Sequence, residues 1–400
     1  MEDDPNGVGK NYERGVKRDM GSLAFFIRCL AAVMSLFPVR NRVVFLSRQS
    51  STLSLDYRML RDELASRLPQ ESVCVCLAAP ETQGKLRFAL NMLAQLWYAR
   101  TSKVCIVDGY SPVISIPAKR KGCTVIQLWH ALGAVKKFGF QSLDTPSGRS
   151  SHEARVACMH EGYDAIVAAG PGAVPAYAEA FGYDQDVVAV TGLPRMDYLL
   201  DPRPEADRKA TADRLVSEHP FLGEEAPVVL YAPTFRKGIE DDNWLSHAIE
   251  DLARAFDGAG VNLVITGHPL QHGFDEALLA RYPHLRFVSG AAAIGMLELA
   301  DSVITDYSAV AFEAAVAGVG VYFYVPDIVE YRRSPGLNID PVLEFADVAA
   351  VQADDVAAMV MAGLKKGADS SFLRYSEAYF EGIAFGSTSR LADLVCRKLA

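Results

Sequence analysis

The feature that most constrains the fold is the regular alternation of short apolar runs with helix-like segments. In the first half of the chain, the apolar runs that read as buried strands are 42–47, 73–77, 104–108, 124–128, 164–168 and 187–190. Helical patterns over about 56–68, 85–100 and 174–181 lie between several of these runs. Strands that alternate with helices of this length predict stacked β-α units and a parallel sheet, which is an α/β fold.

The same alternation restarts in the second half of the chain. Strands are predicted there at 228–231, 262–266, 285–288, 302–305 and 321–324. A segment rich in proline and charge, followed by a polar helix, separates the two halves and is typical of a domain boundary. We therefore predict five parts: a tail and helix over 1–40, a first domain over 41–200, a linker over 201–225, a second domain over 226–375 and a closing helix over 376–400.

The composition argues against several classes of function. The net charge is −9 over 400 residues, whereas a general nucleic-acid binder needs clustered Lys and Arg. Seven cysteines without regular spacing indicate thiols in a reducing compartment. The histidines form no metal-binding motif, and Gly170-Pro171-Gly172 is only a fragment of a dinucleotide fingerprint. We therefore expect no metal and no cofactor.

The segment 20–37 is helical in composition and almost wholly apolar, with Arg28 in its middle. A central arginine disfavours a membrane-spanning helix, and no cleavage site for a secretory signal follows. The preferred interpretation is an amphipathic helix in the membrane interface, with Phe25 and Phe26 inserted and basic residues, Arg28 among them, facing anionic headgroups. A core helix packed on the first domain and a true span stay as alternatives.

The sharpest feature of the first domain is residues 127–139, where His130 follows the end of a predicted strand. Ligands of parallel sheets bind outside the carboxyl ends of the strands. A histidine at that edge can act as the general base for an attacking hydroxyl, and Lys136 can supply positive charge to a substrate. The alternatives are a structural histidine at the strand end and a solvated lysine.

Polar side chains also follow three strands of the second domain. Thr234 and Arg236 come after 228–231, His268 comes after 262–266, and Asp306 and Ser308 come after 302–305. Hydroxyl, imidazole and guanidinium groups that converge on helix N-termini make a cradle for phosphate or pyrophosphate.

Residues 303–315 read as a buried strand that turns into a helix, with Thr305 at the end of the strand. Ser308 can donate a hydroxyl to a phosphate there, whereas the anionic Asp306 would repel phosphate and is expected to orient a neighbour or hold the turn. Simple helix capping is the alternative. Glu313 lies further along the helix, either in reach of a nucleotide ribose or as an exposed helix charge.

Four motifs, in order over roughly residues 120–335, resemble the CDP-glycerol glycerophosphotransferase family, the membrane-associated bacterial enzymes that build teichoic acid. They are Trp129-His130 with its lysine-glycine tail, Tyr231 to Arg236, Gly267-His268-Pro269, and Ile304 to Ser308 continuing to Pro326-Asp327 and Tyr331. The resemblance implies a GT-B-type fold, in which two Rossmann-like domains with parallel sheets face each other across a cleft. It places the acceptor in the first domain and the nucleotide donor in the second, and it implies monotopic attachment to the cytoplasmic face of the membrane.

The resemblance also implies roles for individual residues. His130 resembles the histidine that deprotonates the acceptor hydroxyl, and His268 resembles the one that contacts the donor pyrophosphate. The residues that resemble the donor-phosphate pocket are Arg236, Thr305, Asp306 and Ser308. The family's Trp-His-Gly-Thr-Pro-Leu-Lys is here Trp-His-Ala-Leu-Gly-Ala-Val-Lys, so the acceptor's identity and a donor carrying ribitol or another polyol stay open. The chain is also short for a polymerase, which leaves open a priming enzyme that adds one unit.

The resulting hypothesis is a transferase that moves glycerol phosphate from CDP-glycerol to a hydroxyl of a lipid-linked acceptor and releases CMP. Its expected partners are the donor, that acceptor and an anionic membrane surface, with no nucleic acid. One alternative keeps the architecture but acts as a nucleotide-sugar glycosyltransferase or epimerase. Another is a catalytically silent membrane scaffold with the same fold.

Overall fold

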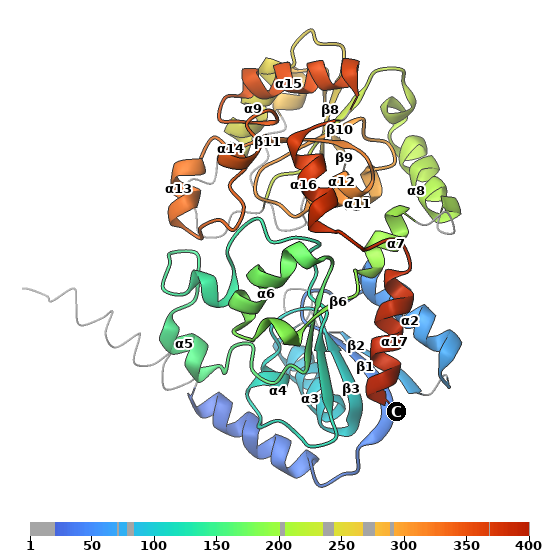
Figure 1. Ribbon diagram of the computed structural model, residues 1–400, viewed down its shortest axis with the longest axis vertical. Helices are drawn as coiled ribbons and strands as arrows, with labels where there is room; N and C mark the ends of the chain where they lie inside the picture. Colours follow the sequence, from blue (N-terminus) through green and yellow to red (C-terminus); the bar gives the residue numbers. More distant parts are fainter. Residues whose placement is uncertain are drawn as a thin grey trace, which may run out of the picture.

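Two parallel sheets form the centres of two lobes that are stacked along the long axis of the molecule (Figure 1). The computed structural model describes residues 21–69, 72–77, 84–200, 205–234, 244–266, 277–288, 292–367 and 369–399. Each sheet has six strands, and all the strand pairs are parallel. The predicted α/β class with two parallel sheets is confirmed.

The first sheet has the order β2-β1-β3-β4-β5-β6. Its strands are β1 (Arg40–Ser47), β2 (Val73–Leu77), β3 (Ser102–Val107), β4 (Thr124–Gln127), β5 (Ala165–Ala168) and β6 (Val188–Val190). The helices of this lobe are α2 (Leu55–Arg67), α3 (Lys85–Thr101), α4 (Pro112–Ser115), α5 (Ser151–Val156), α6 (Val174–Phe181) and α7 (Pro194–Leu200). The central strand β1 is apolar and buried from Val43 to Leu46, as expected for a parallel sheet with both faces covered.

The second sheet has the order β12-β11-β10-β7-β8-β9. Its strands are β7 (Val228–Tyr231), β8 (Asn262–Thr266), β9 (Leu285–Val288), β10 (Ser302–Thr305), β11 (Gly320–Tyr324) and β12 (Ala349–Ala350). Its helices are α9 (Trp244–Ala255), α10 (Ala277–Arg281), α11 (Ala293–Met296), α12 (Val310–Val316), α13 (Ile328–Arg333), α14 (Pro341–Glu344), α15 (Ala353–Lys366) and α16 (Ser371–Tyr379). Only the short edge strand β12 lies outside the predicted strands.

The chain ends by returning to the first lobe. α8 (Glu205–Glu218) connects the lobes, and the last helix, α17 (Ser387–Leu399), packs against α2, α7, β1 and β3 (Figure 1). Asp197 of α7 fixes the start of α17, because its carboxylate accepts hydrogen bonds from the backbone N–H groups of Gly386, Ser387 and Thr388 at 2.6–2.9 Å. The domain limits given above stay a prediction.

The N-terminal helix, residues 21–34, lies along the far end of the first lobe (Figure 1). Ala24 and Ala31 are buried against the lobe, whereas Phe25 and Phe26 are 69% and 57% exposed. Arg28 donates from Nε to the carbonyl of Ile116 at 3.1 Å, which links the helix to the lobe. The residue is nevertheless exposed, and its expected role facing lipid headgroups stays a prediction. Among the residues that the structure describes, no helix has both the length and the apolar character that crossing a bilayer requires.

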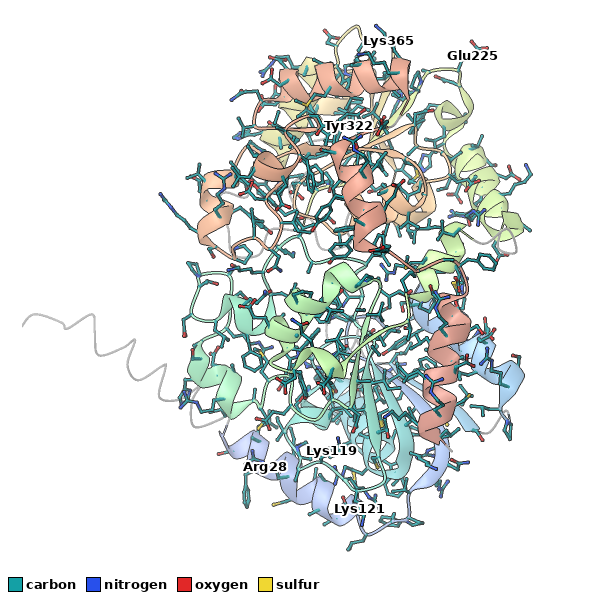
Figure 2. All side chains as sticks on the ribbon, in the orientation of Figure 1. Arg28, Lys119, Lys121, Glu225, Tyr322 and Lys365 are labelled. Atoms are coloured by element: carbon teal, nitrogen blue, oxygen red, sulfur yellow. The ribbon has the colours of Figure 1, made fainter. Side chains whose placement is uncertain are left out.

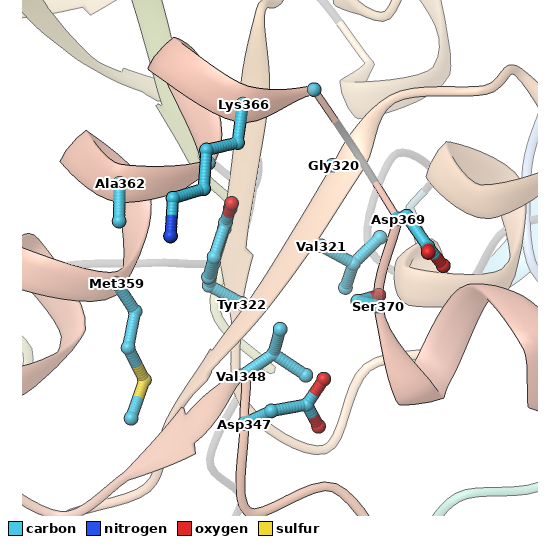
Figure 3. A pocket seen from close by; sticks show the side chains of 12 residues that line it. Gly320, Val321, Tyr322, Asp347, Val348, Met359, Ala362, Lys366, Asp369 and Ser370 are labelled. Atoms are coloured by element: carbon cyan, nitrogen blue, oxygen red, sulfur yellow. The ribbon is translucent and has the colours of Figure 1, made fainter.

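A cavity of about 270 Å³ lies in the second lobe at the start of β11, where Tyr322 faces Met359, Ala362 and Lys366 of α15 (Figure 3). This is the end of the sheet opposite to the carboxyl ends of the strands. A Cβ atom at Gly363 would lie 1.6 Å from the Tyr322 hydroxyl oxygen. The close approach of α15 to the sheet therefore requires glycine at this position.

We expect Gly363→Ala to lower the free energy of unfolding by about 1–3 kcal/mol, the usual cost of overpacking. The penalty should shrink in a Tyr322→Phe background, because that change removes the oxygen that the new methyl group meets. Urea or thermal unfolding of the four variants measures the coupling between the two positions.

Gly295→Ala is the matched control for this prediction. Gly295 is also helical, but its Cβ atom would meet Thr211 Cγ2 at an ordinary 3.6 Å. This variant should therefore unfold close to the wild type. An equal penalty for Gly363→Ala with Tyr322 and with Phe at position 322 would contradict the steric explanation.

Candidate functional site

His130 lies just beyond β4, at the carboxyl edge of the first sheet. The preceding residue, Trp129, has a φ of 61°, and this left-handed turn directs the chain out of the strand. His130 Nδ1 lies 2.9 Å from the backbone carbonyl oxygen of Asp108. Because a carbonyl can only accept, Nδ1 carries the proton and Nε2 of the neutral ring has a free lone pair. The imidazole is thus held in the tautomer that a general base needs.

The surroundings of His130 favour the neutral ring. Its side chain is accessible to solvent, yet the protein around it desolvates the imidazole and lowers its pKa. The hydrogen bond to Asp108 opposes this shift, while the positive charges of Arg195 and Lys136 add to it. His130 is therefore ready to accept a proton at neutral pH.

The loop that follows His130 packs directly on the second lobe. A Cβ atom at Gly133 would lie 2.2 Å from the nearest ring carbon of Phe312 in α12. The backbone N–H of Ala134 donates to the Tyr379 hydroxyl of α16 at 3.3 Å. These contacts place the His130 loop at the boundary between the two lobes.

Lys136 belongs to the same interlobe contact. It forms an antiparallel bridge with Leu337, and its carbonyl accepts from Asn338 Nδ2 at 3.2 Å. The next N–H, that of Lys137, donates to the carbonyl of Gly336 at 2.9 Å. The half-buried Lys136 thus lies where the two lobes meet, and its predicted contact with substrate stays a prediction.

In the second lobe, Asp306 ties together the ends of β7 and β10. Its Oδ1 accepts from the backbone N–H and the hydroxyl of Thr234 at 2.8 and 2.6 Å, and from the N–H of Tyr307 at 2.5 Å. The Thr305 hydroxyl donates to the carbonyl of Ala232 at 2.7 Å. All three predicted residues, Thr234, Thr305 and Asp306, are buried. Their observed hydrogen bonds hold the turn.

Ser308 is the half-buried residue of this turn, two residues before α12. Its hydroxyl oxygen lies 3.4 Å from the N–H of Val310. The preceding Tyr307 stacks on Tyr331 with ring centroids 3.7 Å apart, and its hydroxyl donates to Asp327 at 3.0 Å. The turn is therefore also fixed to the start of α13, and contact between Ser308 and a phosphate stays a prediction.

Glu313 forms an ion pair with Arg195 of α7. Arg195 in turn donates from Nε and from its backbone N–H to the Asp56 carboxylate of α2, each at 2.8 Å. Burial acts to lower the pKa of Arg195, but the two carboxylates outweigh it and raise that pKa above its ordinary value. Glu313 thus joins the lobes, whereas its predicted contact with a ribose is not tested by these contacts.

Two residues of the predicted donor pocket, Arg236 and His268, lie outside the described residues. The expected convergence of the second-lobe strand ends is therefore observed only for Thr234 with Thr305 and Asp306.

Asp108 is a residue of the site that the sequence interpretation missed. It follows β3, is buried, and accepts from the Ser47 hydroxyl at 2.6 Å. Burial raises the pKa of Asp108 to about 6, and the Ser47 hydrogen bond only partly opposes this shift. The sequence did contain a signal for Asp108. This carboxylate follows the apolar strand β3, and the neighbouring strand β4 is followed by His130.

Comparison with known proteins gives relatives along most of the chain. A teichoic acid ribitol-phosphate primase of Bacillus spizizenii is 28% identical over 75% of this chain and 77% of its own length. A teichoic acid glycerol-phosphate primase of the same organism is 26% identical over 80% of each chain. A solved structure of the wall teichoic acid polymerase TagF superimposes with a TM-score of 0.68 at 15% identity, covering 98% of this chain and 98% of the other. The last similarity establishes a common fold.

The expected GT-B-like arrangement of two parallel-sheet lobes is thus shared with TagF. The sequence profile described as CDP-Glycerol:Poly(glycerophosphate) glycerophosphotransferase matches residues 30–376, which includes both sheets and all the residues predicted for the catalytic and donor sites. The chain therefore belongs to the CDP-glycerol:poly(glycerophosphate) glycerophosphotransferase family.

Proposed function

We propose that the protein transfers a polyol phosphate, with CDP-glycerol as the donor, to a hydroxyl of a lipid-linked acceptor in teichoic acid synthesis. The observation that carries this proposal is the neutral His130, whose free Nε2 lies at the lobe boundary where its loop packs on α12. Family membership and the primase relatives support the reaction class.

In the proposed reaction, His130 Nε2 accepts the proton of the acceptor hydroxyl as its oxygen attacks the β-phosphorus of the donor. The bond between that phosphorus and the bridging oxygen breaks, and CMP leaves. Positioned hydrogen-bond donors stabilise the charge that spreads over the phosphoryl oxygens. Ser308, Arg236 and His268 are the groups proposed to supply them, while Thr234 and Asp306 keep the turn in place.

The choice between glycerol and ribitol is a separate question, because relatives of both kinds are similar to this chain. CDP-glycerol is our first choice of donor and CDP-ribitol is the alternative. Thermal-shift measurements with both compounds and with UDP-sugars would identify the donor, because a ligand stabilises the folded state according to its concentration and affinity. Selective stabilisation by a UDP-sugar would instead favour the glycosyltransferase or epimerase hypothesis.

We also propose that the far end of the first lobe rests on the cytoplasmic face of the membrane. The N-terminal helix exposes Leu23, Phe25, Phe26 and Val33 there, and Leu36 follows it. Such a cluster of exposed apolar side chains favours an interaction with lipid.

A basic cavity lies beside the same helix and supports this orientation. It has a volume of about 510 Å³, and its lining includes Lys103, Lys119, Arg120, Lys121 and Lys398. Arg120 donates to the carbonyl of Phe37, just after the helix, and Figure 2 labels Lys119 and Lys121 at the same end of the first lobe as Arg28. Cationic side chains next to an apolar helix attract anionic headgroups.

The first prediction from this proposal concerns His130. We expect His130→Ala to lower the transfer rate at least about 100-fold, the usual contribution of a general base, while CDP-glycerol binding changes only a few-fold. Transfer of label from CDP-glycerol to membrane lipid and calorimetric donor binding measure the two effects. His152→Ala, an exposed histidine of α5, is the control. Loss of donor binding together with turnover would assign His130 to donor binding or to the fold instead.

The second prediction concerns pH. Only neutral His130 can accept the proton, so kcat/KM should fall as the pH drops through the pKa of this residue. Because its surroundings lower that pKa, the acidic limb should lie below the ordinary histidine value of about 6.5. A pH profile of the wild-type enzyme with the acceptor below saturation checks this, and an acidic limb above that value would contradict the assignment.

The third prediction concerns the membrane. Wild-type protein should float with vesicles of phosphatidylglycerol and phosphatidylcholine and bind less to phosphatidylcholine alone. Phe25→Asp/Phe26→Asp should abolish flotation, whereas Phe385→Asp, at a phenylalanine that is 56% exposed elsewhere, should not. Equal flotation of all three proteins would remove the helix from the proposed membrane surface.

A further inference from the structure

Three neighbouring strand ends of the first sheet bring Arg48 and Tyr110 to the same edge as His130. β1, β3 and β4 are adjacent, with Leu46 opposite Val107 and Val107 opposite Gln127. Arg48 and Tyr110 therefore follow the ends of β1 and β3, just as His130 follows the end of β4. The two connecting loops also touch, because a Cβ atom at Gly109 would lie 2.7 Å from Gln49 Nε2.

Two arginines gather around Tyr110. Arg149 Cζ lies 5.0 Å from the centroid of the Tyr110 ring, and both Arg48 and Arg149 interact electrostatically with the tyrosine. Burial lowers the pKa of Arg48, and the positive charge of Arg149 lowers it further. The two guanidinium groups are thus close enough to repel each other.

The described structure contains no carboxylate that offsets this repulsion. Within the described ranges, neither arginine forms a salt bridge, and Arg48 Nε is buried without a hydrogen-bond partner. An anion bound between the half-buried Arg48 and the exposed Arg149 would offset their mutual repulsion and give the buried Arg48 Nε an acceptor. Guanidinium groups suit phosphate in particular, because their paired N–H donors match its oxygens.

The position of the two arginines indicates which substrate would carry the phosphate. The Tyr110 hydroxyl donates to the carbonyl of Ala157 at 2.7 Å, and the next residue, Cys158, lies 3.5 Å from Arg28 Nη2 of the N-terminal helix. On the other side, Asp108, two residues before Tyr110, holds His130. Tyr110 and its arginines therefore lie between the proposed membrane-facing helix and the proposed general base.

We propose that Arg48 and Arg149 bind a phosphate group of the acceptor while its hydroxyl is presented to His130. This inference rests on the proposed function and specifies the substrate class as a phosphate-bearing acceptor. That phosphate belongs either to the diphosphate that joins a lipid to its glycan or to a terminal polyol phosphate already on the acceptor. In the first case the arginines favour priming, and in the second they favour extension.

The test compares Arg48→Gln, Arg149→Gln and the double variant with three soluble acceptors. One is a short-chain prenyl-diphosphate glycan, the second is the same glycan on an uncharged alkyl chain, and the third is that uncharged glycoside ended by glycerol phosphate. We expect the KM for the phosphate-bearing acceptor to rise at least tenfold, with the KM for CDP-glycerol and the rate on the uncharged acceptor little changed. The acceptor that loses affinity identifies the source of the phosphate.

Arg155→Gln is the control, because Arg155 is an exposed residue of α5 close in sequence to Arg149. Equal losses with charged and uncharged acceptors, or no loss with either charged one, would overturn the inference. Thermal unfolding of each variant separates a folding defect from a binding defect.

A binding measurement keeps this test independent of turnover. Calorimetry of the prenyl-diphosphate and glycerol-phosphate acceptors, without donor, should show weaker binding to the double variant than to wild type. If wild-type protein transferred nothing to any acceptor but still bound one of them through the two arginines, the proposed function would fail and the phosphate site would stand. Equal binding to wild type and double variant would reject the site.

Discussion

The arrangement of the site depends on one buried set of charges, in which Arg195 lies between Asp56 of the first lobe and Glu313 of the second. Removing these groups from water costs free energy, which their mutual attraction and hydrogen bonds must offset. This set of charges therefore matters for the relative position of the two lobes as much as for the stability of the fold. It ties α12, the helix that follows the Ser308 turn, to the lobe that carries His130. The charge of Arg195 also lowers the pKa of His130, so one side chain both fastens the lobes and favours the neutral imidazole.

Glycines at the boundary allow the two lobes to pack closely against each other. Gly133 allows the His130 loop to reach Phe312, and Gly170 and Gly172 allow α16 to approach the first lobe. Cβ atoms at these last two positions would lie 2.4 and 2.3 Å from the backbone and ring of Tyr379. The glycine-proline-glycine segment, which on sequence alone was a fragment of a dinucleotide fingerprint, thus has a packing explanation. Methyl groups at these glycines would push the lobes apart and change the position of His130 relative to the Ser308 turn.

The two sheets, and the strand ends that the candidate residues follow, could be predicted from the sequence. Apolar runs and the polar residues after them are local signals. The sequence was insufficient for the partners of those residues. Arg195 is 139 residues from Asp56 and 118 from Glu313, and each could equally have been a surface charge. Asp306 was expected to orient a neighbour or hold the turn, and its bonds to Thr234 agree with that expectation. The Ile116 carbonyl that accepts from Arg28 was equally invisible, because the sequence of an apolar helix does not show which backbone group lies beside its arginine.

The partner of His130 has a consequence for the chemistry that the proposed reaction requires. A carboxylate at Nδ1 would stabilise the imidazolium and raise its pKa, whereas the carbonyl of Asp108 fixes the tautomer with a smaller electrostatic effect. The result is a base that is neutral but weak. Phosphoryl transfer tolerates such a base, because the transition state of this reaction is loose. The bond from the attacking oxygen to phosphorus is little formed when the leaving group departs, so the hydroxyl has lost little of its proton at that point. Orientation of the acceptor hydroxyl then matters more than proton affinity, which is what a rigid loop held by both lobes provides.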